Sequence, residues 1–431
     1  MKKLLLILLS LPMIGFGQEW EATFLNPSYA TAVQQTSDGG YIITGKHYSN
    51  NWEDGDVYLL KVNNNGIQQW VQHFSGAGGQ SPHDFGGVGG HSVQQTTDGG
   101  YIIAGAYLDS TGSVTDEGGV GVLIKTDVNG SLQWEKVNVS TYYRDVVETT
   151  DGGFIIVTSN SNVIKTDING NEQWISQIDH YVNSIIQTSD GGYVACGGLK
   201  YNISGAPETL GHITKMGNNG GILWHQIHGD YQNVNWAEFT DIQQTSDGGY
   251  ILTGELNYNI PNVQNEVNVW LIKVNSYGYF EWEETFNGLS YEESSGSSID
   301  ITSDGGYIIT GSRTDDDLYY NVLLTKTDGQ GNLEWEKTFG TLAWGYAVQQ
   351  TSDGGYIIAG DSRDNNGINE TYLIKTNSQG NVTSTFNIPI NPNRKIQKTV
   401  DILGKETKPQ TNTPLIEIYD DGTVEKRIVI E

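Results

Sequence analysis

The segment Asp353-Gly354-Gly355-Tyr356-Ile357-Ile358-Ala359-Gly360 decides the fold, because segments built like it recur along the chain. Each copy begins with Asp-Gly-Gly and continues with an aromatic residue and an apolar run. Repetition at intervals of roughly 50 residues is typical of proteins in which each repeat is one supersecondary unit. The seven copies begin at Asp38, Asp98, Asp151, Asp190, Asp247, Asp304 and Asp353.

A second element follows each copy. A Lys is followed five residues later by a Gly, and in six copies a Trp stands four residues beyond that Gly. Because both turn regions suit tight hairpins, each repeat predicts four antiparallel strands. Seven repeats therefore predict an all-β fold, a seven-bladed β-propeller of four-stranded antiparallel blades. The Trp residues of this element are Trp70, Trp134, Trp174, Trp224, Trp282 and Trp335.

The seventh repeat lacks its Trp, since Ser384 stands at that position. The missing element is found at the other end of the chain, where residues 19–24, including Trp20, match residues 334–339. We therefore expect the Trp20 strand to complete the last blade and close the ring, which also removes exposed sheet edges. A parallel β-solenoid is the alternative fold, but it does not need a circularly displaced Trp strand.

The composition fits a globular repeat protein. The 431 residues include 55 Gly but only 9 Pro, and there is no Gly-X-Y period, so collagen is excluded. Hydrophobic residues make up 36% of the chain and can build a core. The net charge of −28 disfavours nucleic acid and anionic lipid surfaces as partners.

The repeated segments resemble the secreted β-propeller repeat proteins of Bacteroidota-type bacteria. The Gly-x-x-x-Trp element is also similar to the tryptophan docking motif of quinoprotein dehydrogenase propellers. In that motif the Trp packs between neighbouring blades, so the resemblance implies the same role for the repeat Trp residues here. It implies no ligand.

The start of the chain has the layout of a secretory signal peptide. Residues 1–17 combine Lys2 and Lys3, an apolar run at residues 4–14 and a small-x-small cleavage site. The apolar run is too short for a membrane anchor, and no later segment is long enough, so no transmembrane segment is expected. We expect a protein that is secreted or at the cell surface after cleavage.

The end of the chain differs from the repeats. We expect the propeller to occupy residues 18–388, a linker to follow at 389–393, and a small β module to occupy residues 394–431. This module resembles the C-terminal sorting domain read by the type IX secretion system, which implies that machinery as a partner. A β-hairpin packed on the propeller is the alternative.

The sequence contains few candidates for catalytic or metal-binding residues. The periodic Asp and Lys residues are expected to be structural, as turn formers and recurring ion pairs, because a residue present in every blade is needed by the blade. Turns such as Asp127-Val128-Asn129-Gly130 are only half of a calcium loop, so calcium has weak support and no metal site or other cofactor is predicted. His225 and His228 are expected on opposite faces of a strand, and Cys196 is expected to be buried.

The repeats differ on one face. The connections between second and third strands and between blades vary in length, and we call the side that carries them the variable face. The side that carries the Asp-Gly-Gly turns is the uniform face. Trp52 is expected in a second–third connection, and Trp236 and Trp344 in connections between blades. Because binding surfaces on repeat scaffolds are built from variable loops, these three are the predicted ligand-binding residues. The alternative is that they pack the loops onto the disc, whereas Trp270 is expected in the core.

The acidic second–third loops favour a cation or a cationic partner, unless they are simply solvated. Taken together, the sequence predicts a secreted or cell-surface binding module for an extracellular glycan or protein. The alternatives are a polysaccharide-degrading enzyme with carboxylates near the central channel, or a structural surface or adhesion component. Catalysis is disfavoured because no nucleophile or metal-hydrolase motif is present.

Overall fold

The computed structural model describes residues 19–24, 28–48, 55–75, 89–107, 120–138, 141–203, 206–229, 234–258, 267–286, 293–364, 366–382, 395–401, 414–419 and 424–428. These residues form strands and turns without a helix. The contacts divide the chain into two units, residues 1–383 and 384–431. The expected signal peptide and the linker at 389–393 lie outside the described residues.

The described residues of the first unit form seven four-stranded antiparallel blades, of which the first six are up-and-down meanders. One parallel bridge, between Thr209 and Trp236, joins blades four and five into an eight-stranded sheet. Blades one to three are β2 (Ser28–Gln35), β3 (Tyr41–Tyr48), β4 (Gly55–Val62) and β5 (Gln68–Phe74); β6 (Gly89–Gln95), β7 (Tyr101–Tyr107), β8 (Val120–Thr126) and β9 (Leu132–Asn138); and β10 (Tyr143–Glu148), β11 (Phe154–Thr158), β12 (Asn162–Thr166) and β13 (Glu172–Gln177).

The remaining blades follow the same plan. Blades four to six are β14 (Tyr181–Gln187), β15 (Tyr193–Ile203), β16 (Ala206–Met216) and β17 (Ile222–His228); β18 (Val234–Gln244), β19 (Tyr250–Tyr258), β20 (Val267–Val274) and β21 (Phe280–Phe286); and β22 (Ser294–Ile301), β23 (Tyr307–Thr314), β24 (Tyr320–Thr327) and β25 (Leu333–Phe339). Blade seven contains β26 (Ala343–Gln350), β27 (Tyr356–Arg363) and β28 (Asn369–Thr376).

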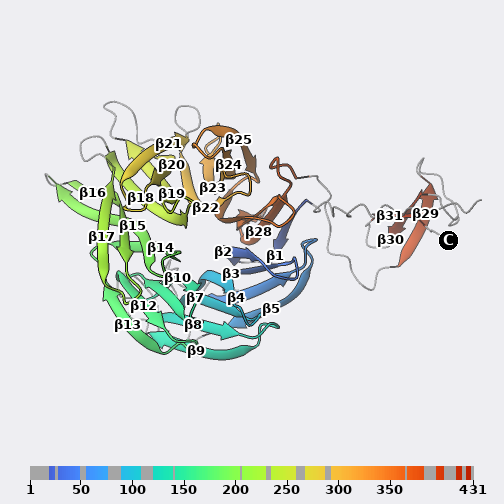
Figure 1. Cartoon of the computed structure of the whole chain (residues 1–431). Helices are drawn as coiled ribbons and strands as arrows, with labels where there is room; N and C mark the ends of the chain where they lie inside the picture. Colours follow the sequence, from blue (N-terminus) through green and yellow to red (C-terminus); the bar gives the residue numbers. More distant parts are fainter. Residues whose placement is uncertain are drawn as a thin grey trace, which may run out of the picture. The chain divides into compact units, whose positions relative to one another are not determined.

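The fourth strand of blade seven comes from the start of the chain. β1 (Trp20–Phe24) pairs antiparallel with β28, with Trp20 opposite Lys375. In Figure 1 the blue β1 lies beside the brown β28, and β2 of the first blade contacts β26, β27 and β28. The predicted all-β fold is therefore confirmed, and the displaced Trp20 strand takes the place expected for it.

Burial within a blade explains the apolar pattern of the repeats. The second and third strands are covered on both faces; in blade two, every residue of β7 is buried, and so are all but one of β8. The outermost strand β9 alternates between exposed and half-buried residues. A strand buried on both faces reads as a continuous apolar run, which is why Tyr-Ile-Ile segments mark the middle of each blade.

Each repeat Trp lies between neighbouring blades. Trp20 of blade seven is 2% exposed and donates from Nε1 to the carbonyl of Asn64 in blade one at 3.0 Å. Its ring covers Gly66, where an added Cβ would stand 2.7 Å from the indole, and it meets Tyr41 edge to face at 6.0 Å. The same Trp-on-Gly contact recurs at all seven blade boundaries. The role implied by the docking-motif resemblance is therefore the one observed.

The second unit is a three-stranded antiparallel sheet of β29 (Ile396–Asp401), β30 (Pro414–Tyr419) and β31 (Val424–Ile428). It falls within the segment expected to form a small β module. No helix capable of crossing a membrane is found in the part of the chain that the structure describes.

Candidate functional site

The uniform face is occupied by structural ion pairs. Each repeat Lys is almost fully buried and reaches the first Asp of its own Asp-Gly-Gly turn. Although partial burial raises the pKa of Asp98, hydrogen bonds from Thr96, Lys125 and Gly100 outweigh it and lower that pKa to about 2. Each of these carboxylates thus holds a turn and a lysine within its blade. The pairs, at 2.7 to 3.0 Å, are Lys61–Asp38, Lys125–Asp98, Lys165–Asp151, Lys215–Asp190, Lys273–Asp247, Lys326–Asp304 and Lys375–Asp353.

The half calcium loops are hairpin turns in the structure. Asp127 Oδ1 accepts the backbone N–H groups of Asn129 and Ser131 at 2.9 and 2.8 Å. Asn63 makes the same two bonds in blade one through its amide oxygen. Because a neutral Asn serves as well as an Asp at this position, the turn itself accounts for these residues.

The three tryptophans predicted to bind ligand have different surroundings. Trp52 lies outside the described residues. Trp236 and Trp344 were expected in loops between blades, and that expectation is wrong: Trp236 lies in β18 and Trp344 in β26, each near the start of a first strand. Trp236 is 41% exposed, and Trp344 is partly buried. Trp270 is fully buried, as expected.

Trp236 and Trp344 belong to a strip of aromatic and acidic side chains on blades five to seven. The acidic aromatic strip consists of Trp236, Glu238, Glu255, Glu293, Tyr320 and Trp344. Trp236 Nε1 donates to Glu238 Oε2 at 3.2 Å, and Tyr320 Oη donates to Glu293 Oε2 at 2.9 Å. The rings of Tyr320 and Trp344 lie 5.4 Å apart.

Charge is concentrated in this strip. Burial, followed by the nearby charges of Glu238 and Glu293, raises the pKa of Glu255 to about 7. Arg363 adjoins the strip, with its guanidinium 5.2 Å from the centroid of the Trp344 ring. The strip therefore offers aromatic surface beside carboxylates that repel one another.

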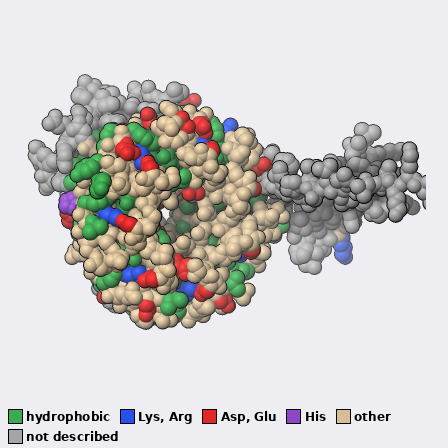
Figure 2. All heavy atoms as spheres, in the orientation of Figure 1, with side chains coloured by type: hydrophobic (Ala, Val, Ile, Leu, Met, Phe, Trp, Pro, Cys, Tyr) green, Lys and Arg blue, Asp and Glu red, His purple; other side chains and the backbone are tan. Residues whose placement is uncertain are grey.

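The first strands of the blades surround the axis of the disc, where two further carboxylates lie. Figure 2 shows one face of the disc, with a central opening and acidic side chains spread around it. Ser184 Oγ lies within hydrogen-bond distance of both Asp145 Oδ2, at 3.2 Å, and Asp241 Oδ1, at 3.1 Å. Asp145 also accepts from Ser92, and Asp241 from Ser298. Serines and aspartates alternate from blade two to blade six and link neighbouring blades.

These channel carboxylates were not singled out in the sequence, although a signal exists. Ser92, Asp145, Ser184, Asp241 and Ser298 all stand six residues before the Asp of their turn. Burial, with a further contribution from the charge of Asp145, raises the pKa of Asp241 to about 6, despite the hydrogen bonds it accepts. Their bonds to backbone N–H groups of adjacent blades indicate that they hold the ring together.

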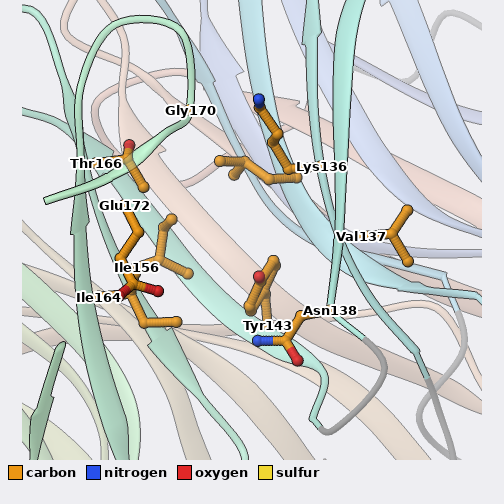
Figure 3. Close-up of a pocket in the computed structure, with 10 residues that line it drawn as sticks. Lys136, Val137, Asn138, Tyr143, Ile156, Ile164, Thr166, Gly170 and Glu172 are labelled. Atoms are coloured by element: carbon orange, nitrogen blue, oxygen red, sulfur yellow. The ribbon is translucent and has the colours of Figure 1, made fainter. Parts of the chain in front are cut away.

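A pocket of about 300 Å³ lies between blades two and three (Figure 3). Lys136 and Val137 line it from β9, and Ile156 and Glu172 line it from blade three. Lys136 is already bonded to Asn171 Oδ1 at 3.0 Å. The pocket combines apolar walls with a few polar groups at a blade boundary, away from the acidic aromatic strip.

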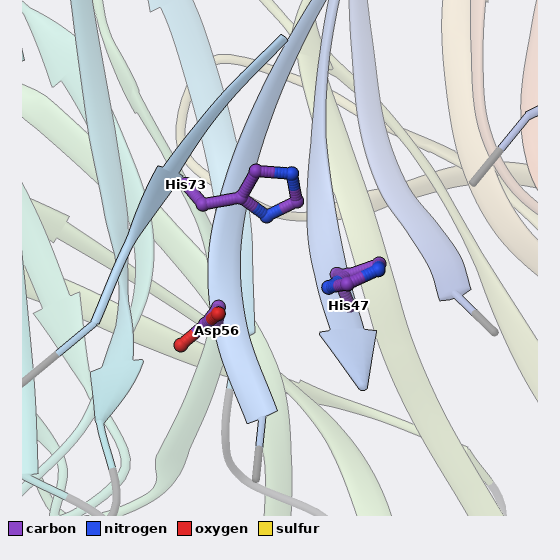
Figure 4. Close-up of side chains that lie close together, drawn as sticks. All are labelled: His47, Asp56 and His73. Atoms are coloured by element: carbon purple, nitrogen blue, oxygen red, sulfur yellow. The ribbon is translucent and has the colours of Figure 1, made fainter. Parts of the chain in front are cut away.

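Two histidine groups come together that the sequence did not indicate. His47, Asp56 and His73 come from neighbouring strands of blade one (Figure 4), and Asp179, His180 and His212 meet where blade three leads into blade four. In each group one ligand atom per residue lies within 4.8 Å of the others. No short motif could have identified them, because the residues come from separate segments.

The remaining candidates are explained by packing. Cys196 is fully buried, and burial raises the pKa of its thiol well above the usual value. His91 lies in β6, where its Nδ1 is 2.6 Å from the carbonyl oxygen of Tyr143. His228 contacts Gly278 of blade five, whereas His225 lies beside His212, so the two do face opposite sides of β17.

Solved structures share the fold. The WD40 β-propeller domain of Doa1 aligns with a TM-score of 0.51 and 12% identity, over 84% of this chain and 97% of that domain. YCF48 bound to D1 peptide aligns with a TM-score of 0.48 and 12% identity, over 85% of this chain and 99% of that chain. BamB from Moraxella catarrhalis aligns with a TM-score of 0.44 and 11% identity, over 83% of this chain and 96% of that chain. No protein-family model and no curated protein matches the sequence. The likeness to the Doa1 domain supports the propeller fold and assigns no ligand.

Proposed function

We propose that the protein is a binding module that recognises an extracellular protein through the acidic aromatic strip. The observation that carries this proposal is the exposed Trp236 ring beside Glu238, together with the Glu293–Tyr320 and Tyr320–Trp344 contacts on the following blades. Aromatic side chains are enriched at protein interfaces because they combine a large apolar area with a polar edge. Mutually repelling carboxylates favour a partner segment that brings Lys or Arg.

Export of the chain forms part of the proposal. It is supported by the charged and apolar layout of residues 1–17 and by the separate three-stranded unit β29–β31, which fits a small C-terminal sorting module. The partner would then be met outside the cell, after passage by the type IX route. Mass spectrometry of the exported chain should find a new N-terminus near residue 18; retention of Met1 in the exported protein would contradict the proposal.

The binding proposal is tested with the purified full chain and two probes. A library of Lys- and Arg-rich peptides should contain ligands whose affinity falls as salt rises, because exposed charges are screened. Trp236→Ala and Trp344→Ala should each weaken binding by about tenfold. Tyr277→Ala is the matched control, since Tyr277 is 64% exposed but lies on the uniform face.

A glycan array distinguishes the alternative ligand. Binding to glycans but not to basic peptides, with the same loss in Trp236→Ala, would replace the protein ligand by a sugar stacked on the indole. Release of reducing or unsaturated ends from polysaccharides would instead indicate an enzyme. Equal loss of binding in Tyr277→Ala would contradict the assignment to the variable face.

A further inference from the structure

Four of the eight histidines of the chain lie in one region, at the entry to and within blade four. Asp179 and His180 belong to the connection between β13 and β14, His212 to β16, and His225 and His228 to β17. The rings of His180 and His212 are 3.9 Å apart, and those of His212 and His225 are 5.5 Å apart. Asp179 Oδ1 is 3.9 Å from His212 Nε2.

His212 is buried, although the two nitrogens of its ring make no hydrogen bonds to the described residues. The residue is 1% exposed, and neither Nδ1 nor Nε2 has a hydrogen-bond partner among the residues that the structure describes. Buried polar atoms are nearly always paired, because a buried donor or acceptor without a partner loses its hydration and gains nothing in return. Because this imidazole lies beside a carboxylate and a second imidazole, its unpaired nitrogens are placed to bind an additional group, such as a metal ion.

His180 is already oriented as a metal ligand would be. Its Nδ1 is 3.0 Å from the carbonyl oxygen of Tyr181, so Nδ1 carries the proton and donates it. Nε2 then accepts a hydrogen bond from Thr214 Oγ1 at 2.9 Å, and a bound ion would take the place of that hydroxyl. Donation from the second ring nitrogen to a backbone carbonyl is the usual way in which proteins fix the tautomer of a ligating histidine.

Two imidazoles and one carboxylate converge at this point of the fold. One possible ligand atom of each residue lies within 4.8 Å of the others.

We propose that Asp179, His180 and His212 form a binding site for one divalent transition metal ion of the zinc class. Imidazole nitrogen suits Zn²⁺ and its neighbours, whereas Ca²⁺ and Mg²⁺ prefer oxygen ligands. Tetrahedral zinc places its ligand atoms about 3.3 Å apart, so the Asp179–His212 pair needs only a small side-chain adjustment. Asp179 is largely exposed, which gives the ion a route in and leaves one side of the site open.

The ion would connect two blades. Asp179 and His180 belong to the segment that leads out of blade three, and His212 belongs to the third strand of blade four. A metal ion held by both would fasten this connection to β16. His225 lies on the same face of the sheet as His212, because it is paired with Thr214, two residues along β16.

The other histidine group is a comparison within the same chain. His47 is only partly buried and has one buried nitrogen, Nδ1, without a partner among the described residues. His73 is exposed, and Asp56 has another interaction. This group therefore lacks the fully buried ring with two unpaired nitrogens that distinguishes His212. We expect it not to bind zinc at comparable affinity.

The test uses the purified full chain, stripped with a chelator and titrated with Zn²⁺ in competition with a chromogenic chelator. His212→Leu is the informative variant, because Leu323 and Val122 occupy the same repeat position in other blades and the fold accepts them there. Asp179→Asn tests the exposed ligand with little risk to folding. His73→Ala is the matched control in blade one.

We expect one equivalent of zinc per chain in the wild-type protein and a rise in melting temperature on binding. His212→Leu should lose that equivalent and the thermal shift, Asp179→Asn should weaken binding at least about tenfold, and His73→Ala should change neither. Co²⁺ should give a visible absorption band that is absent in His212→Leu. Zinc binding that survives His212→Leu, zinc binding that His73→Ala abolishes, or no binding at micromolar zinc would each overturn the proposal.

Discussion

At the scale of single residues, the protein shifts the pKa values of its carboxyl groups in both directions from their ordinary values. Aspartates of the uniform face are held ionised by a lysine and by backbone N–H groups, as in Asp98. Asp361 of blade seven is instead fully buried, and Asn369 Nδ2 donates to its Oδ2 at 2.6 Å. Burial raises the pKa of Asp361 to about 7, although Tyr346 and Arg363 partly offset the rise.

Asp361 should therefore make the propeller less stable as the pH rises. In the unfolded chain this carboxyl ionises near its ordinary value of about 4, whereas in the folded protein it stays protonated until about pH 7. The stability that the protonated Asp361 contributes is complete below about pH 4. It falls between pH 4 and pH 7, by roughly 2–4 kcal/mol for a pKa shift of this size. Asp361→Asn should abolish this part of the pH dependence.

Chemical denaturation at pH 5 and pH 8 measures the effect. The difference in unfolding free energy between the two pH values should shrink in Asp361→Asn. It should be unchanged in Asp316→Asn, because Asp316 is an exposed residue of a turn. An identical pH profile in Asp361→Asn and the wild-type protein would show that the carboxyl does not titrate in this range.

At the scale of the blade, the contact between a Trp and a Gly joins each repeat to the next. Gly278 has φ of +77°, and a Cβ added there would stand 2.5 Å from the ring of Trp224. Gly248, in the Asp-Gly-Gly turn of the same blade, has φ of +83° but nothing within 4 Å of an added Cβ. The two glycines therefore separate backbone strain from packing.

Gly278→Ala should destabilise the protein more than Gly248→Ala. The positive φ alone costs about 1–2 kcal/mol for Ala, and at Gly278 the displaced indole adds about 1–3 kcal/mol. The measurement is the unfolding free energy of the two variants beside the wild type. Equal losses would mean that the Trp224 ring moves aside without cost, and that docking contributes little to the boundary between blades.

At the scale of the whole molecule, local spacing sufficed to predict the fold but not the candidate metal site. The position of Trp20 was readable because the seventh repeat lacks a residue that the first six possess. Asp179 and His212 could not be paired in this way, because they meet across a blade boundary and occur once each. Trp236 and Trp344 were assigned to loops because the first strands of blades five and seven begin earlier than the repeat pattern indicates.

The pairing of β1 with β28 should make Trp20 critical for two blades, the seventh and the first. Trp20 completes blade seven through β1 and packs on Gly66 and Tyr41 of blade one. Trp20→Ala should therefore cost about 3–5 kcal/mol, the usual range for a buried Trp, whereas the 41% exposed Trp236 should cost less than about 1 kcal/mol on the same change. Because the cavity lies at the seam between first and last blades, hydrogen exchange should accelerate first in β1 and β28, whose backbones pair there. Faster exchange spread evenly over all seven blades would instead mean that the ring unfolds as one unit and that the seam is no weaker than any other boundary.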